Sequence, residues 1–204
     1  MAGAGRPEMS IVHLSIAAAL WPRRDAVLAD AIRAVTLVLL GIALLTLSAK
    51  VSIPLPPVPM TLQTLVVLVI GAAYGWRLGV VTILAYLATG ALGLPVFAGP
   101  TGGLAPLFGA TAGFLFGFVV AAFMVGWLSE RGWDRSVVRM FVAMALGHVV
   151  ILALGFAWLA WGRGLGIDRA WAAGVGPFLA GAVVKNLLGA VLVPALRRWA
   201  DRGA

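Results

Sequence analysis

The sequence of 204 residues contains no cysteine, and charged residues make up only 11% of it. The absence of cysteine excludes disulfide bonds, thiol catalysis and thiolate metal sites. The few acidic residues all lie near the ends of apolar runs or in the tails: Glu8, Asp25, Asp30, Glu130, Asp134, Asp168 and Asp201. Carboxylate pairs, Ser/His/Asp triads and metal-ligand clusters are missing as well. We therefore expect neither an enzyme nor a cofactor or metal site.

Hydrophobic residues make up 62% of the sequence, against about 45–50% in ordinary soluble domains. A soluble fold of this length could not bury so much apolar surface, whereas a lipid bilayer accepts it. The net charge of +8 comes from basic residues near the ends of apolar runs. Such residues meet phospholipid headgroups and set topology, so we expect the lipid bilayer as a partner and no nucleic acid.

The hydropathy pattern predicts an all-α integral membrane protein with six transmembrane helices. The predicted spans are Ala26–Ser48, Pro59–Tyr74, Leu78–Leu92, Thr111–Leu128, Val137–Trp161 and Pro177–Trp199. The second and third spans are shorter than the about 20 residues that cross a bilayer, and Gly75-Trp76-Arg77 leaves room only for a tight turn between them. Residues 26–199 then form one transmembrane domain. Residues 1–25 form an N-terminal cytoplasmic and interfacial segment that includes Ile11–Trp21, and residues 200–204 form a cytoplasmic tail.

The basic residues predict the orientation. With the N-terminus inside, eleven of the 15 lysines and arginines fall on the cytoplasmic side and three (Lys50, Arg163 and Arg169) fall outside, while Lys185 lies within a span. This asymmetry predicts that both termini are cytoplasmic (N-in/C-in). The outer loops Val51–Met60 and Gly93–Ala110 are then apolar and rich in proline and glycine. Irregular apolar backbone at the membrane must be covered, so we expect these loops to cap an outward-facing cavity.

Lys185 is the strongest candidate for a binding residue. It lies about eight residues inside the last span, where an ionised lysine costs about 2.5–3.5 kcal/mol. No carboxylate is predicted within the membrane to pair with it, so an anionic group of a substrate could supply the missing charge. The alternative is that the side chain extends to the nearer membrane surface.

Further polar residues are candidates on neighbouring spans. His148 lies within the fifth span, where a lone histidine more often joins two helices than binds a ligand. Thr61 and Gln63 begin the second span, where they could also act in helix capping. Tyr86 on the third span and Asn186 beside Lys185 are weaker candidates.

Two long segments resemble the signature of the BioY family, the biotin-specific substrate-binding components of energy-coupling-factor transporters. These segments are Ser52–Thr64 (SIPLPPVPMTLQT) and Gly90–Gly99 (GALGLPVFAG), and Pro177-Phe178-Leu179 leading to Lys185 continues the match. The resemblance covers residues 20–198. It implies six helices in a bacterial inner membrane, a capped biotin pocket, and partnership with two ATPase subunits and a transmembrane coupling subunit, or self-association where those partners are absent.

This sequence departs from the family pattern at several positions. The family's Pro-Gly-Asp-x-x-Lys is Ala180-Gly181-Ala182-Val183-Val184-Lys185 here, so the lysine is kept and the aspartate is Ala182. Thr101 occupies the centre of a glycine loop that often carries a basic residue in the family. The resemblance implies Lys185 as the partner of the biotin carboxylate, with Thr61 and Gln63 near the cap.

Three functions remain open from the sequence. High-affinity biotin binding and uptake is the first. A carrier for another small, partly apolar carboxylic acid is the second, which the loss of the aspartate at Ala182 favours. A membrane scaffold without a ligand is the third, although apolar loops rich in glycine and proline are unusual in a scaffold.

Overall fold

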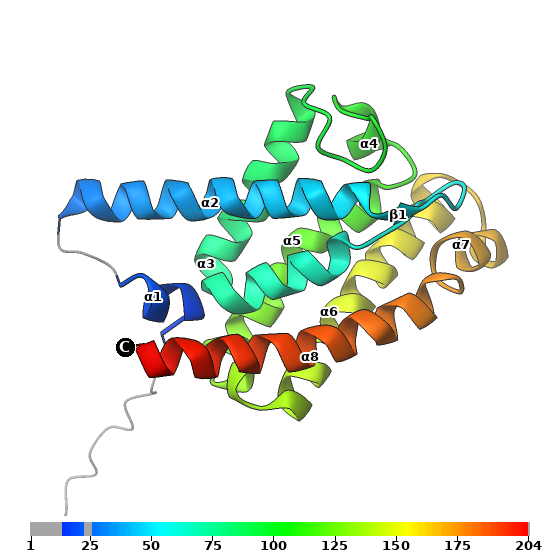
Figure 1. Cartoon of the computed structure of the whole chain (residues 1–204). Helices are drawn as coiled ribbons and strands as arrows, with labels where there is room; N and C mark the ends of the chain where they lie inside the picture. Colours follow the sequence, from blue (N-terminus) through cyan, green and yellow to red (C-terminus); the bar gives the residue numbers. More distant parts are fainter. Residues whose placement is uncertain (1–13, 23–25, 204) are drawn as a thin grey trace, which may run out of the picture.

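The structure is a computed structural model that describes residues 14–22 and 26–203. Within these residues the chain is mostly helical, and five helices are long and apolar enough to cross a membrane. They are α2 (Val27–Lys50), α3 (Gln63–Ala91), α5 (Ala112–Ser129), α6 (Val137–Ala157, continued by the π-helical turn η2 at Trp158–Gly162) and α8 (Phe178–Gly203). Figure 1 shows them gathered into one bundle.

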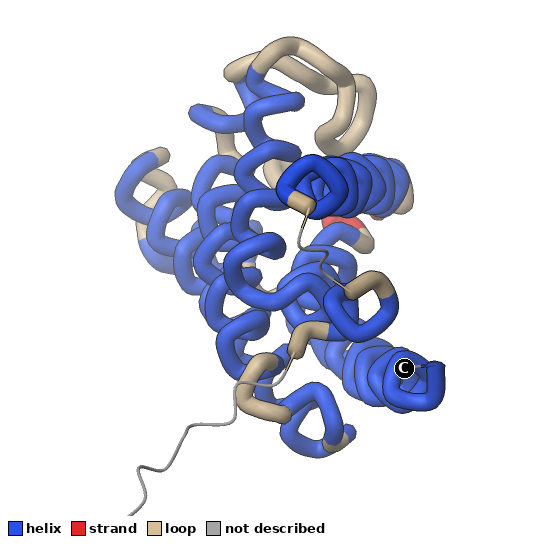
Figure 2. The backbone as a smooth tube through the Cα atoms, turned by 90° about the vertical axis from the view of Figure 1, so that its left-hand side faces the viewer, coloured by secondary structure: helices blue, strands red, loops and turns tan. Residues whose placement is uncertain are grey.

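Shorter elements lie at the two ends of this bundle. Helix α1 (Ile16–Leu20) and the 3₁₀ turn η1 (Trp133–Arg135) lie at the end where α8 finishes. Strands β1 (Ser52–Ile53) and β2 (Met60–Thr61), together with helices α4 (Ala105–Phe108) and α7 (Ile167–Gly174), lie toward the opposite end, which we call the cap end (Figure 1). Figure 2 looks along α2 and α8, which are seen nearly end-on. The N-terminal residues 1–13 of the predicted interfacial segment lie outside the described part.

Helix α3 reverses direction at Gly75. The backbone there has φ 78° and ψ 171°, a conformation that glycine adopts far more readily than other residues. The two arms, Gln63–Tyr74 and Trp76–Ala91, fold back on each other: Gly71 approaches Gly79 near the turn, and Gln63 hydrogen-bonds Tyr86 at the open end. The predicted tight turn at Gly75-Trp76-Arg77 is therefore observed, and α3 is a helical hairpin.

The end of α5 holds the α3 turn in place. A break in a helix exposes carbonyls on one side and N–H groups on the other, and each needs a partner. Ser129 Oγ donates to the carbonyl of Ala72 at 2.8 Å, and Glu130 Oε1 accepts from the backbone N–H of Trp76 at 3.3 Å. A side chain at Gly71 would collide with the backbone of Ala122, which shows how closely the two helices pack.

The predicted second span began too early. Residues 59–62 are not helical, because Met60–Thr61 pairs with Ser52–Ile53 as a two-stranded antiparallel ribbon. The prolines of this segment cannot donate backbone hydrogen bonds and so disfavour a helix. We call residues 51–62 the strap. The last helix also continues past the predicted end of its span at Trp199, since α8 ends at Gly203.

The bundle presents apolar surface outward, as expected where lipid is the solvent. Along α8 the buried residues recur every three or four positions, on one face of the helix: Ala182, Asn186, Ala190, Val193, Arg197 and Ala200. Large apolar side chains on the other faces of α8 are exposed, among them Leu188. The exposed residues of α2 include many leucines and valines.

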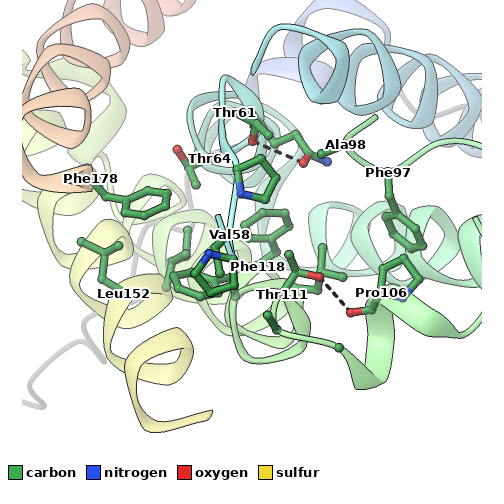
Figure 3. Close-up of a pocket in the computed structure, with 18 of the residues that line it drawn as sticks. Val58, Thr61, Thr64, Phe97, Ala98, Pro106, Thr111, Phe118, Leu152 and Phe178 are labelled. Carbon is green, nitrogen blue, oxygen red and sulfur yellow. Dashed lines mark hydrogen bonds between the residues drawn. The ribbon is translucent and has the colours of Figure 1, made fainter. Parts of the chain in front are cut away.

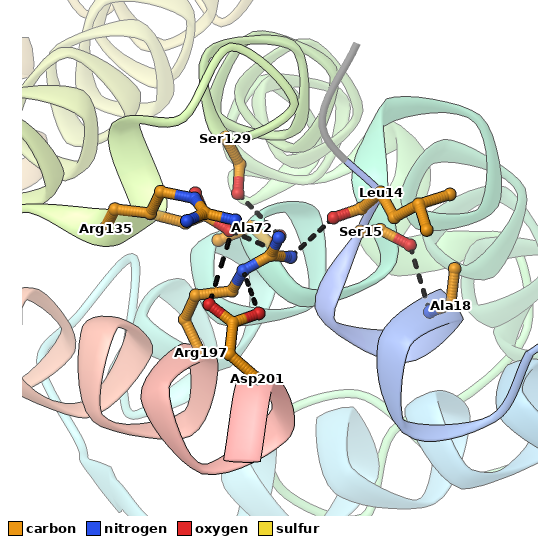
Figure 4. A network of polar contacts seen from close by, with 9 residues as sticks. Leu14, Ser15, Ala18, Ala72, Ser129, Arg135, Arg197 and Asp201 are labelled. Carbon is orange, nitrogen blue, oxygen red and sulfur yellow. Dashed lines mark hydrogen bonds and ion pairs between the residues drawn. The ribbon is translucent and has the colours of Figure 1, made fainter. Parts of the chain in front are cut away.

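An ion-pair cluster joins the elements at the end opposite the cap. Arg197 on α8 is 4% exposed and lies 3.6 Å from Asp134 of η1, which is 1% exposed, and 3.1 Å from Asp201. Arg197 also donates to the carbonyl of Leu14, just before α1 (Figure 4). One arginine thus connects α8, η1 and the start of the described chain.

Candidate ligand-binding cavity

A cavity of about 360 Å³ lies toward the cap end, within the range of about 300–1,000 Å³ that is typical of small-molecule pockets. Its walls come from the strap, from the start of α3, from helices α4, α5, α6 and α8, and from the loop between α3 and α4. We call that loop, residues 92–104, the pocket loop. Segments far apart in the sequence therefore meet around one cavity.

Most of the cavity wall is apolar, and aromatic rings line several sides of it. Phe97 comes from the pocket loop, Phe118 from α5 and Phe178 from the start of α8 (Figure 3). Phe114 of α5 lines the cavity as well. The Phe114 and Phe178 rings stack, with centroids 6.0 Å apart. Such walls suit a ligand with a compact apolar body.

Lys185 brings a charge to this apolar cavity. Its ammonium donates to the carbonyl of Thr61 at 2.6 Å and to Thr64 Oγ1 at 3.1 Å. An ammonium group has three N–H donors, so these two bonds leave one for a ligand. Among the described residues Lys185 takes part in no ion pair, since the ion pairs there all lie around Arg33, Arg135 and Arg197. The side chain therefore points inward rather than to the membrane surface.

Thr64 connects Lys185 to His148. His148 Nδ1 lies 3.3 Å from the carbonyl oxygen of Met144, and Nε2 lies 3.0 Å from Thr64 Oγ1. A carbonyl only accepts, so Nδ1 carries the proton, Nε2 accepts from the Thr64 hydroxyl, and that hydroxyl accepts from Lys185. Both ring nitrogens and the Thr64 hydroxyl are satisfied with a neutral imidazole, which suits a position beside an ammonium.

A second polar chain ties the strap to the pocket loop. Gln63 Nε2 donates to Tyr86 Oη at 2.6 Å, and Tyr86 Oη donates to the carbonyl of Val96 at 2.9 Å. Thr61 Oγ1 lies 3.3 Å from Gln63 Oε1. Gln63 faces the cavity, and Tyr86 is fully buried behind Gln63. The tyrosine therefore positions the glutamine side chain and does not itself contact the cavity.

The structure brings together five of the seven residues that the sequence proposed as a site. Lys185, Thr61, Gln63, Thr101 and His148 all line the cavity. Tyr86 and Asn186 do not line it. Tyr86 faces the interface between the α3 hairpin and the pocket loop, and Asn186, which is 5% exposed, lies one position past Lys185 and so faces the helices packed against α8.

Several residues of the cavity were missed in the sequence. Thr64, which bonds both Lys185 and His148, is an ordinary threonine in an apolar run. Its place directly after Gln63, at the start of α3, was the available signal. The aromatic residues Phe97, Phe114, Phe118 and Phe178 could not be told from lipid-facing side chains, because the helix faces were not yet known. Ala182 also lines the cavity, one turn before Lys185.

A comparison with known protein families shows which family the chain belongs to. The BioY family model matches residues 16–202. The chain belongs to the BioY family. Among BioY relatives, a probable biotin transporter of Pyrococcus horikoshii is 37% identical over 163 residues, which cover 80% of this chain and 95% of the relative. A biotin transporter of Rhizobium etli is 39% identical over 176 residues, which cover 83% and 90%.

The fold of this BioY chain matches a solved structure. That structure is the crystal structure of the S-component for biotin from an ECF-type ABC transporter. The TM-score is 0.74 at 23% identity, and the match covers 83% of this chain and 93% of the other. The two chains therefore share a fold.

Proposed function

We propose that this protein binds biotin in the cavity at the cap end and takes part in its uptake across the cytoplasmic membrane. The observation that carries the proposal is Lys185, an ammonium with one N–H donor left for a ligand, set in a wall of aromatic and aliphatic side chains. Biotin has the matching chemistry: a compact bicyclic ring for the apolar walls and a carboxylate for the lysine. Relatives that match over most of this chain carry the name biotin transporter.

The site residues take distinct roles in this proposal. Lys185 pairs with the carboxylate, and Thr61, Thr64 and His148 hold the ammonium in position. Gln63 and Thr101 offer polar groups at the cap side of the cavity. Tyr86 and Asn186 support the wall from behind.

The membrane arrangement is part of the proposal. We place both termini in the cytoplasm and count the two arms of α3 as separate crossings, which gives six transmembrane helices. Each arm is shorter than the about 20 residues of a full span, so the turn at Gly75 lies short of the far surface unless the bilayer thins there. The excess of basic residues at the Arg197 end supports a cytoplasmic location for that end in a bacterial inner membrane.

Transport against a gradient needs an energy source outside this chain. The glycine-rich residues 99–103 lack the Lys-Ser/Thr ending of a P-loop, and the sequence has no such motif elsewhere. The similar solved structure is a component of an ECF-type ABC transporter. We therefore propose two ATPase subunits and a transmembrane coupling subunit as partners, with self-association as the alternative.

Ala182 favours a second candidate of the same class. It lines the cavity one turn from Lys185, where the family pattern has an aspartate, so the wall offers a methyl group in place of a carboxylate. A ligand that needs a second polar contact there would bind more weakly. Another small, partly apolar carboxylic acid is thus the alternative substrate.

Competition distinguishes the two candidates. Purified protein in detergent is incubated with radiolabelled biotin and with increasing unlabelled biotin, a biotin amide, or straight-chain acids of similar length. We expect unlabelled biotin to compete best, and the amide to compete at least about tenfold less well because it lacks the charge that pairs with Lys185. A straight-chain acid that competes better than biotin would assign the cavity to the alternative substrate.

A further inference from the structure

The pocket loop is an irregular apolar segment whose central carbonyls are held by side chains, while backbone bonds hold its two ends. The carbonyls of residues 95–99 all accept hydrogen bonds from side chains. Lys50 donates to Pro95, Phe97 and Gly99 at 2.6, 2.8 and 2.6 Å, Tyr86 donates to Val96, and Thr101 donates to Ala98. Residues 95–99 bend and turn rather than run straight, so the segment curves around the lysine and brings every second carbonyl to the same nitrogen.

Lys50 uses all three of its N–H donors on this loop. An ammonium has three donors and no acceptor, so the three carbonyls satisfy it completely. Hydrogen bonds from a charged donor are stronger than those between neutral groups. The lysine is exposed at the end of α2, yet its nitrogen is bound as fully as that of a buried group. A role limited to marking the outer face in topology would not need this geometry.

The position of Lys50 joins the two segments that cover the cavity. Lys50 is the last residue of α2, and the strap begins at the next residue. The strap contributes Pro57, Val58 and Pro59 to the cavity wall, and the pocket loop contributes Phe97, Ala98 and Thr101. At its other end, the strap is held by Lys185 through the carbonyl of Thr61. The two lysines therefore act at opposite ends of the strap: Lys50 binds the pocket loop beside its start, and Lys185 binds the strap near its end.

Phe97 shows what the Lys50 bonds fix in place. The residue is 3% exposed, its ring packs edge-to-face on Tyr86 with centroids 5.5 Å apart, and it lines the cavity. Its own carbonyl is one of the three that Lys50 binds. Moving the loop away from Lys50 would therefore move an aromatic wall of the cavity.

We propose that Lys50 is a positioning residue of the binding site, which holds the pocket loop closed against the strap, and that release of its three carbonyls opens the cavity to the outside. The assignment rests on the proposed function for the identity of the ligand, but not for the movement of the loop. It predicts that loss of the Lys50 donors speeds both the entry of a small reagent into the empty cavity and the exit of a bound ligand.

The first test needs no ligand. The chain has no cysteine, so Ala182→Cys places a single thiol in the cavity wall. A water-soluble thiol reagent is added to purified protein, and the labelling rate is compared with Lys50→Met in the same background. Methionine has a similar length and no N–H group, so we expect labelling about tenfold faster or more, given the strength of charge-assisted bonds. Arg169→Met, on α7, removes a charge from an exposed outer residue and should leave the rate unchanged.

The second test measures dissociation of radiolabelled biotin from the wild type, Lys50→Met and Arg169→Met, all without the cysteine. We expect Lys50→Met alone to release biotin about tenfold faster or more.

If Lys50→Met does not fold, Lys50→Gln replaces it. Glutamine keeps two donors but no charge, so the labelling and release rates of this variant should still exceed those of the wild type. Wild-type labelling and release rates in a folded Lys50 variant would overturn the proposal, even if its unfolding temperature fell. A wild type that binds no biotin would instead refute the proposed function, and the labelling rates would still decide the role of Lys50.

Discussion

Lys185→Ala is expected to weaken biotin binding by about 100-fold, which corresponds to about 2.7 kcal/mol. The reason is that the substitution removes the charged donor that meets the carboxylate and leaves the carbonyl of Thr61 without its partner. His148→Ala should cost about tenfold or less, because the imidazole reaches Lys185 only through Thr64. Equilibrium binding of radiolabelled biotin to the two purified variants measures the difference.

Val184→Ala is the matched control for Lys185→Ala. Val184 precedes the lysine on the same helix, and 56% of it is exposed on the outer surface of the bundle. The control should bind as the wild type does. Equal losses in Lys185→Ala and His148→Ala would contradict the assignment of the lysine as the anchor, because the two residues would then contribute only to the shape of the cavity.

Arg197→Ala is expected to destabilise the protein by about 3–5 kcal/mol, the range observed when one partner of a buried ion pair is removed. The substitution leaves Asp134, which is 1% exposed, without the cation 3.6 Å away. It also removes the donor to the carbonyl of Leu14. The unfolding temperature of the purified protein in detergent is the measurement.

Arg198→Ala separates this effect from the loss of a positive charge. Arg198 is the next residue along α8 and is exposed, so its removal lowers the net charge equally without opening the buried cluster. We expect an unfolding temperature close to that of the wild type. Equal destabilisation by both variants would show that the overall charge of this end matters, and not the contact of Arg197 with Asp134.

The sequence predicted the elements whose signals are local. Long apolar runs located α2, α5, α6 and α8 within a few residues, and the glycine at the centre of α3 predicted its reversal. The predicted start of the second span was wrong. The apolar character of residues 59–62 favoured a helix, whereas Met60–Thr61 pairs with Ser52–Ile53 in the ribbon of the strap. Hydropathy measures the preference for lipid, and it does not distinguish a helix from an apolar cap.

The candidate site was predicted to the extent that unusual residue types occur in it. Lys185 was found because a lysine within an apolar helix needs a partner, whereas Thr64 was missed because a threonine there needs none. Lys50 was interpreted only as an outer basic residue, since its three carbonyl partners lie 45 to 49 residues further along the chain. Contacts of that kind follow from the packing of the pocket loop, which no local pattern encodes.

The most direct test of the central claim is saturation binding of radiolabelled biotin to the purified wild type beside Ala182→Phe. Ala182 faces the cavity, and a benzyl group there would fill the space beside Lys185 that the ligand must occupy. We predict one biotin bound per wild-type chain, and no binding by Ala182→Phe at an unfolding temperature close to that of the wild type. A folded wild type that binds no biotin, or equal binding by both proteins, would contradict the claim that this cavity is the biotin site.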